Sequence, residues 1–400
     1  MNKVKICVLT ALSVGAFLSI DGQTMEERIS TLEEKLQTMT DKEPTPGRED
    51  AERGLPEIHG ILRGKYEYEP DLDASRFEVR NARLSAEGNL PLRSSYKLEV
   101  DLCDESAIKM KDAWVRVSPW SNLRITLGQQ RMPFSIDAHR NPSAQYFANR
   151  SFIAKQVGDV RDVGVAVGYS PLRRTHTREE HSVLPDFPRG GELIIDAGIY
   201  NGSNLDNQKS AWFSSPAYSA RAQFIYTSPR GGRVGAVPSV QHQLIAGREA
   251  SYTSMDLGAY YESPLPTSPR RGVLHLEAEF LRKFYDHNAF SPCNAFNAMA
   301  IYRHSLKASP RGGLEGASVL LRYDYMDNHS DGKKGFAEGT TRLQQSDAQR
   351  HRLTAGLTFH VANKYFPTDI RLNYEKYWYP HGGAKESEQD KLVAELMIRF

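Results

Sequence analysis

Basic side chains are concentrated in one long segment of the sequence. In residues 129–162 five bases face three acids, so five minus three gives a formal charge of +2. The bases are Arg131, Arg140, Arg150, Lys155 and Arg161, and the acids are Asp137, Asp159 and Asp162. A guanidinium can donate two parallel hydrogen bonds to phosphate or carboxylate oxygens, and rings of bases at a narrow point select anions. The chemistry that this segment offers is therefore anion binding.

Catalytic and metal chemistry have less support. Ser135, His139 and His351 supply the residue types of a hydrolase, but no Gly-x-Ser-x-Gly or His-x-x-x-His spacing accompanies them. The three cysteines fit neither a disulfide framework nor a metal site, although Cys103 and Cys293 could form one bridge. We expect no catalytic residue, no cofactor and no metal.

The overall composition gives no reason to expect a nucleic-acid partner. Lys and Arg number 51 and Asp and Glu number 49 in 400 residues, so any basic site must be local. Apart from a shorter run at the start, no window approaches 18 apolar residues, so a mature membrane-spanning helix is not expected.

The elements that must position these side chains are strands. From residue 57 onward, apolar and polar residues alternate with the two-residue period of a strand. In YKLEVDL, one face carries Tyr96, Leu98, Val100 and Leu102, and the other carries Lys97, Glu99 and Asp101. The same rule holds in LRITLGQ, VLLRYDY, HRLTAGLTF and LVAELMIRF.

This alternation predicts an all-β fold, namely a transmembrane antiparallel β-barrel of about 16 strands. Closed barrels pair every backbone group in lipid, and they combine an apolar outer band and aromatic girdles with a polar interior. Mean hydropathy is −0.54, as expected when half of each strand faces water. Aromatic residues lie near predicted strand ends: Tyr66, Tyr68, Trp114, Trp120, Tyr374, Tyr377, Trp378 and Tyr379. A soluble β-sandwich or β-solenoid is the alternative.

The predicted strands can be stated as ranges. They are 57–68, 76–88, 93–102, 109–118, 122–129, 161–169, 191–200, 217–227, 233–247, 254–263, 273–285, 294–306, 314–327, 347–360, 368–378 and 390–400. An even number puts both termini on one side, and the terminal Phe400 indicates that this side is the periplasm.

Ser-Pro pairs mark the predicted periplasmic turns. Pro has no N–H to donate to a ladder, so it ends strands. Such pairs follow the predicted fourth, sixth, eighth, tenth and twelfth strands, at Ser118, Ser170, Ser228, Ser268 and Ser309. The connections on the opposite side are expected to be longer.

Strand parity identifies the charged side chains expected to face the barrel interior. The bases are Arg63, Lys65, Arg80, Lys97, Arg116, Arg124, Arg322 and Arg352. The acids on the same face are Glu67, Glu78, Glu99, Asp101, Asp112 and Asp324. Such charges either guide anions or pair with each other to solvate the interior.

The N-terminal residues predict three short regions before the barrel of residues 57–400. Lys3 and Lys5 precede an apolar run typical of a signal peptide, which we assign to residues 1–22. Residues 25–40 carry an a/d seam (Met25, Ile29, Leu32, Leu36, Met39) that predicts either a short oligomerising coiled coil or an ordinary amphipathic helix. Residues 41–56, rich in Pro, Gly and charge, form a predicted linker.

Four motifs resemble the phosphate-selective porin O and P family. They are FEVRNARLSAEGNL, ITLGQQRMPFS, FANRSF followed by VRDVGVAVGY, and IDAGIYNGSN. The resemblance covers roughly residues 57–205 and implies a 16-stranded trimeric channel in the outer membrane of a Gram-negative bacterium. It also implies an inward-folded loop that narrows the pore, and basic residues that guide anions.

The sequence therefore predicts an outer-membrane porin through which small hydrophilic solutes diffuse, with a preference for anions such as phosphate. We expect the pore to be narrowed by loop 129–160. Candidate selectivity residues are Arg131, Arg140, Arg150, Lys155, Arg161, Arg80, Arg116 and Arg124. Expected partners are small anions, outer-membrane lipid, two further copies in a homotrimer, and the outer-membrane assembly machinery through Phe400. The alternative is a surface-exposed structural or binding protein whose pore is secondary.

Overall fold

The computed structural model describes residues 55–104, 107–158, 160–172, 190–202, 216–228, 230–244, 251–265, 272–286, 292–306, 313–327, 348–362, 366–381 and 388–400. The predicted signal peptide, the predicted coiled coil and all of the predicted linker except Leu55 and Pro56 lie outside these residues.

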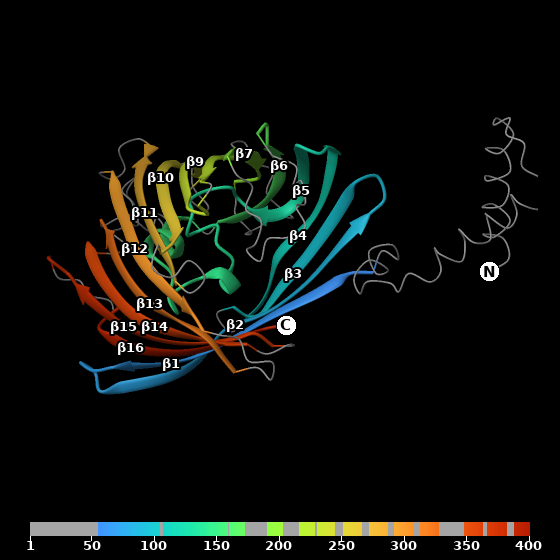
Figure 1. Ribbon diagram of the computed structural model, residues 1–400. Helices are drawn as coiled ribbons and strands as arrows, with labels where there is room; N and C mark the ends of the chain where they lie inside the picture. Colours follow the sequence, from blue (N-terminus) through green and yellow to red (C-terminus); the bar gives the residue numbers. More distant parts are fainter. Residues whose placement is uncertain are drawn as a thin grey trace, which may run out of the picture. The chain divides into compact units, whose positions relative to one another are not determined.

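Sixteen antiparallel strands close into one barrel, in which each strand pairs with its sequence neighbours and β1 pairs with β16 (Figure 1). The strands are β1 (Glu57–Glu69), β2 (Ala74–Leu90), β3 (Ser94–Asp104), β4 (Ala107–Trp120), β5 (Leu123–Arg131), β6 (Arg161–Tyr169), β7 (Gly190–Tyr200), β8 (Ala217–Thr227), β9 (Arg233–Leu244), β10 (Ser251–Pro264), β11 (Gly272–Tyr285), β12 (Cys293–Ser305), β13 (Gly313–Met326), β14 (Arg350–Ala362), β15 (Thr368–Trp378) and β16 (Lys391–Arg399). The predicted barrel and its strand number are confirmed.

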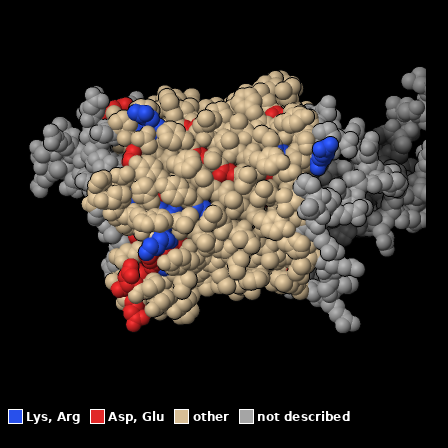
Figure 2. All heavy atoms as spheres, turned by 60° about the vertical axis from the view of Figure 1, so that its left-hand side comes forward, with Lys and Arg blue, Asp and Glu red and all other residues tan. Residues whose placement is uncertain are grey.

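Strand alternation separates an apolar outer face from a charged inner face. In β13, Val319 and Leu321 are 56% and 49% exposed, whereas Arg322 and Asp324, which follow on the opposite face, are 2% and 0% exposed. The outer face in Figure 2 is accordingly free of Lys, Arg, Asp and Glu over most of its described area. This pattern suits a barrel that is surrounded by lipid and filled with polar groups.

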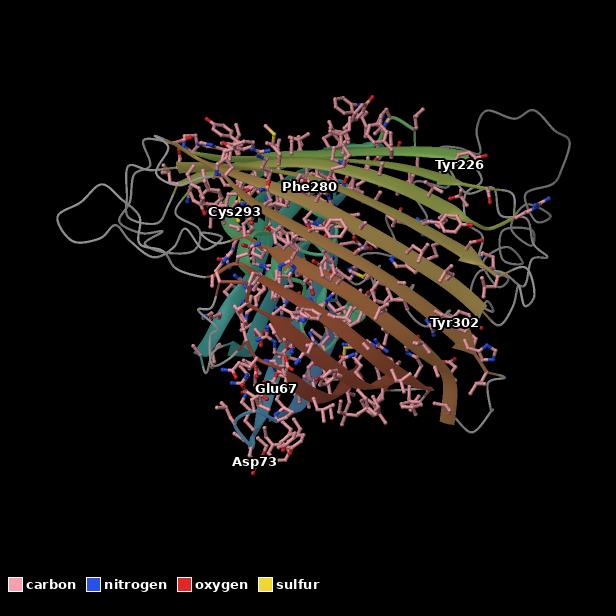
Figure 3. All side chains as sticks on the ribbon, turned by 90° about the vertical axis from the view of Figure 1, so that its left-hand side faces the viewer. Glu67, Asp73, Tyr226, Phe280, Cys293 and Tyr302 are labelled. Carbon is pink, nitrogen blue, oxygen red and sulfur yellow. The ribbon has the colours of Figure 1, made fainter. Side chains whose placement is uncertain are left out.

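The two ends of the barrel differ in their connections. Figure 3 shows Asp73, between β1 and β2, and Cys293 at one end, and Tyr226 and Tyr302 at the other. Connections at the second end include residues 91–93 and 121–122, while the segment 132–160 begins and ends at the first end. The hairpins after β1 and β3 are short. The expectation of longer connections at this end therefore does not hold for every connection.

Three local expectations need correction. Strand β4 runs through Ser118 and Pro119 to Trp120, with a register shift after Val117, so this Ser-Pro pair lies within the strand end. Trp114 faces Lys97 across the ladder and lies on the inner wall, so it is not a girdle residue. No disulfide joins Cys103 to Cys293.

The barrel closes where β1 meets the C-terminus. Backbone hydrogen bonds join Gly60 and Phe400 in both directions, at 2.6 and 3.1 Å. A Cβ on Gly60 would lie 2.2 Å from the Phe400 ring, so a larger residue here would have to displace the ring from its place over β1.

No helix among the described residues is long and apolar enough to cross a membrane. The described residues likewise contain no group of three or more His, Cys, Asp or Glu side chains suited to a metal ion.

Candidate anion path in the barrel interior

The segment that connects β5 to β6 lies within the ring of strands, as the green segment in Figure 1 shows. Its apolar side chains Phe134, Phe152, Ile153 and Val157 are buried in one cluster with residues of β10 to β15, including Leu281. We call residues 132–158 the inner loop.

Four arginines from neighbouring strands hold the inner loop by its backbone. We call them the anchor arginines. Their donors lie 2.5–3.0 Å from loop carbonyl oxygens: Arg63 to Ala148, Arg322 to Asn149, Arg352 to Arg150 and Arg371 to Gln145. Their side chains are at most 3% exposed, and each pairs with a wall carboxylate, Asp324 or Glu395. Two further carboxylates complete the balance of four against four: Glu375 lies 3.5 Å from Arg352, and Asp369 lies 3.6 Å from Arg371. Their charges are therefore neutralised and covered by the loop.

A carboxylate fixes the first turn of the inner loop. Ser135 has a φ of 61°, a left-handed conformation that non-glycine residues adopt only when contacts hold them there. Its hydroxyl donates to Glu279 Oε1 at 2.8 Å, and the amides of Ile136 and Asp137 donate to the same carboxylate. Arg221 donates to the Ser135 carbonyl at 3.2 Å.

The middle of the inner loop is cross-linked by Asp137. This carboxylate pairs with Arg140 and accepts a hydrogen bond from the Ser151 hydroxyl at 2.6 Å. Arg140 also pairs with Glu277 of β11 at 2.5 Å. Burial alone would raise the pKa of Asp137, but the positive charges of Arg140 and Arg322 and the Ser151 hydrogen bond hold that pKa below its usual range.

Four of the five predicted bases of this region have side chains engaged within the loop or with the wall. Arg131, at the end of β5, donates to the His139 and Arg140 carbonyls at 2.8 and 3.2 Å and so links the start of the inner loop to its middle. Lys155 pairs with Glu388 at 2.9 Å. Arg161 pairs with Asp112 at 3.0 Å, and Arg150 is half-buried and uses its carbonyl as an acceptor for Arg352. The structure thus brings these bases onto the loop and its edges rather than into one ring.

The inner faces of β3, β4 and β5, which we call the open wall, carry bases that remain more accessible. Arg124 pairs with Asp196 at 2.5 Å, yet its side chain is 37% exposed. Arg116 is half-buried, and its Nε donates to Thr126 Oγ1 at 3.0 Å. Within the described part of the chain, no carboxylate lies within ion-pair distance of Arg116.

Arg124 owes its position to a glycine on the next strand. A Cβ on Gly168 would lie 2.2 Å from Arg124 Nε, so the Arg124 side chain occupies space that β6 leaves free at this glycine. Arg80 belongs to the neighbouring strand β2, where it sits at a register shift against Arg63 and Gly64. Its side chain is 34% exposed and lies 3.6 Å from Glu78.

Several inner-wall residues escaped the sequence analysis. Arg83 pairs with Asp101 and Glu99, but the β-bulge at Arg80 reverses the parity of β2, so alternation counted from Arg80 points it outward. Arg371 and Glu279 lie in strands with regular alternation, so strand parity alone could have predicted that their side chains face the interior. Their contacts with the inner loop depend on residues far away in the sequence, which alternation does not report.

The match to a family model covers residues 64–178, from within β1 to just beyond β6, and the model describes the phosphate-selective porin O and P family. The chain resembles this porin family. No curated protein sequence matches the chain.

Solved porin structures share the fold at low sequence identity. Pseudomonas putida OprB is 12% identical with a TM-score of 0.56, covering 88% of this chain and 96% of that one. Vibrio cholerae OmpT, outer-membrane expressed, is 9% identical with a TM-score of 0.53, covering 87% and 97%. An anion-selective porin of Comamonas acidovorans is 15% identical with a TM-score of 0.50, covering 86% and 98%. The chain thus has the fold of these porins, a closed antiparallel β-barrel of 16 strands.

Proposed function

We propose that this porin is a passive channel for small hydrophilic solutes that prefers anions, phosphate among them, and whose pore is narrowed by the inner loop. One observation carries the proposal. The inner loop packs against the wall that holds the anchor arginines, whereas the open wall keeps cationic side chains accessible to solvent. Fixed cations beside a low-dielectric constriction attract anions and repel cations.

We propose different roles for the predicted selectivity residues. Arg80, Arg116 and Arg124 meet the solute, because their side chains remain partly exposed or lack a carboxylate partner in the described chain. Arg150 is half-buried at the edge of the inner loop and joins them. Four others hold the loop in its position: Arg131, Arg140, Lys155 and Arg161.

Three partners follow from the same proposal. The apolar outer face contacts membrane lipid, since Leu and Val side chains there are exposed on almost every strand. Phe400 is 50% exposed at the end of the chain, which suits recognition by the assembly machinery. A homotrimer is the proposed assembly.

Recordings from single molecules in a planar lipid bilayer test the channel. Purified protein should produce discrete current steps in potassium chloride, and added inorganic phosphate should reduce the chloride current by occupying the same path. Inserted protein without discrete openings would support the alternative, a surface-exposed structural or binding protein. Openings that phosphate leaves unchanged would remove phosphate from the proposed solutes.

A further inference from the structure

Trp114 is an aromatic side chain on the inner wall, where the alternation of β4 otherwise places polar groups. It lies directly opposite Lys97 of β3 and Gly128 of β5. Its strand neighbour Val115 is 48% exposed on the outer face, which confirms that Trp114 points inward. Trp114 is half-buried, and an indole beside cations combines an apolar surface with positive charge, which suggests a ligand surface.

Arg116 lies over this indole ring. Its guanidinium carbon is 4.3 Å from the ring centroid, and its Nε is fixed by Thr126. Its two terminal amino groups make no ion pair with the described residues, in contrast to the anchor arginines, which all do. A stacked, oriented guanidinium with free donors is suited to bind a carboxylate in the bidentate manner.

Two further cations, Lys97 and Arg124, flank Trp114 and Arg116, and each is paired with carboxylates of its own. Lys97 shares its ammonium between Glu87 at 2.6 Å and Glu99 at 3.3 Å. Arg124 approaches from β5, directly beside β4, and pairs with Asp196. The site therefore has one unpaired cation, an aromatic face, and a paired cation on either side.

We propose that Trp114 and Arg116 form a transit site for organic anions that carry a carboxylate on a flat apolar body, such as an aromatic carboxylate. The guanidinium binds the carboxylate, and the edge of the indole contacts the apolar body. A bare phosphate has no apolar body for the indole to contact, so Trp114 would add at most one N–H hydrogen bond to the contact with the guanidinium. This inference rests on the proposed channel function and names a further class of solute.

Block of the chloride current tests the site, with benzoate and acetate as the probes. Both carboxylates can use Arg116, but only benzoate can use Trp114, so half-block should need roughly tenfold less benzoate than acetate. Trp114→Leu should remove this difference, which is measured as the ratio of the two half-blocking concentrations within the same variant. Trp114→Phe should retain most of it, and Arg116→Gln should weaken block by both probes.

Trp120→Leu is the matched control, since Trp120 lies on the same strand but is 63% exposed on the outer face. Equal block by benzoate and acetate in the native channel overturns the inference, as does a benzoate preference that survives Trp114→Leu. If Trp114→Leu gives no channels, two other measurements test the inference: the ratio of half-blocking concentrations of acetate and benzoate in the native channel, and the loss of block by both probes in Arg116→Gln. A native channel that opens and yet shows equal block leaves the proposed channel function standing, whereas absent openings defeat that function itself.

Discussion

Burial and pairing decide which arginines of this barrel can meet a solute. Arg322 and Arg116 both occupy inner-wall positions, but Arg322 is 2% exposed and divides its donors between Asp324 and a loop carbonyl. Arg116 instead lies over an indole ring and pairs with no described carboxylate. Charge that is already matched by a neighbour contributes little to the field that an ion senses, so the two arginines have different roles despite identical chemistry.

Asp137 gives a prediction at the residue scale. Asp137→Asn should destabilise the inner loop at pH 7 by roughly 1–3 kcal/mol, because a buried charge-assisted pair with Arg140 is lost. The native pKa of Asp137 is lowered, so this contribution is present above the ordinary carboxyl pKa of about 3.9 and is lost as pH falls through the lowered value.

Loop cleavage by a protease, measured for both proteins across pH, checks this prediction. The difference in protection should stay constant from pH 7 to about pH 5 and shrink only below about pH 4. A difference that already disappears between pH 7 and pH 5 would contradict the assignment of the charge to Asp137.

The inner loop gives a prediction at the element scale. Arg352 donates to the Arg150 carbonyl, to Asp324 and to the Tyr377 hydroxyl, and a lysine cannot reproduce this fork. Arg352→Lys should therefore loosen the loop and increase current fluctuations in the open state. Arg303→Lys, an exposed arginine on β12, is the control. Equal noise in native protein and both variants would show that the anchor does not hold the loop.

Barrel closure gives a second prediction at this scale. Gly60→Val should lower the temperature at which the folded barrel unfolds in detergent, because the new side chain collides with the Phe400 ring. Gly64→Val, on the same strand, meets no atom within 4 Å at its Cβ and should change the unfolding temperature far less. Similar losses in both variants would mean that strand propensity, rather than the ring contact, sets the cost.

The elements were predictable from the sequence to a greater extent than the site. Alternation has one physical cause, since one face meets lipid and the other does not, so it located all sixteen strands to within a few residues. It failed at Arg83, because a bulge in β2 shifts the register and reverses which face a residue joins. Trp114 shares the parity of Arg116, which alternation placed inside, and it was misplaced only because its aromatic type suggested a girdle residue. The anchoring of the loop was beyond reach, because Arg371 and Gln145 are brought together only by the closed barrel.

At the scale of the whole molecule, the two walls of the interior are unlike each other. On the wall from β13 to β1, the arginines donate hydrogen bonds to the inner loop. On the wall from β3 to β5, cationic side chains remain accessible in the part of the interior that the loop does not fill. The net formal charge of +2 is too small to select ions by itself, so selectivity must come from this local asymmetry.

The reversal potential under a potassium chloride gradient tests this account most directly. We predict that the reversal potential of the native channel lies between zero and the chloride equilibrium potential. The double variant Arg116→Gln/Arg124→Gln should shift the reversal potential toward the potassium equilibrium potential. Native channels that reverse on the potassium side, or a double variant that reverses where the native channel does, would contradict the account.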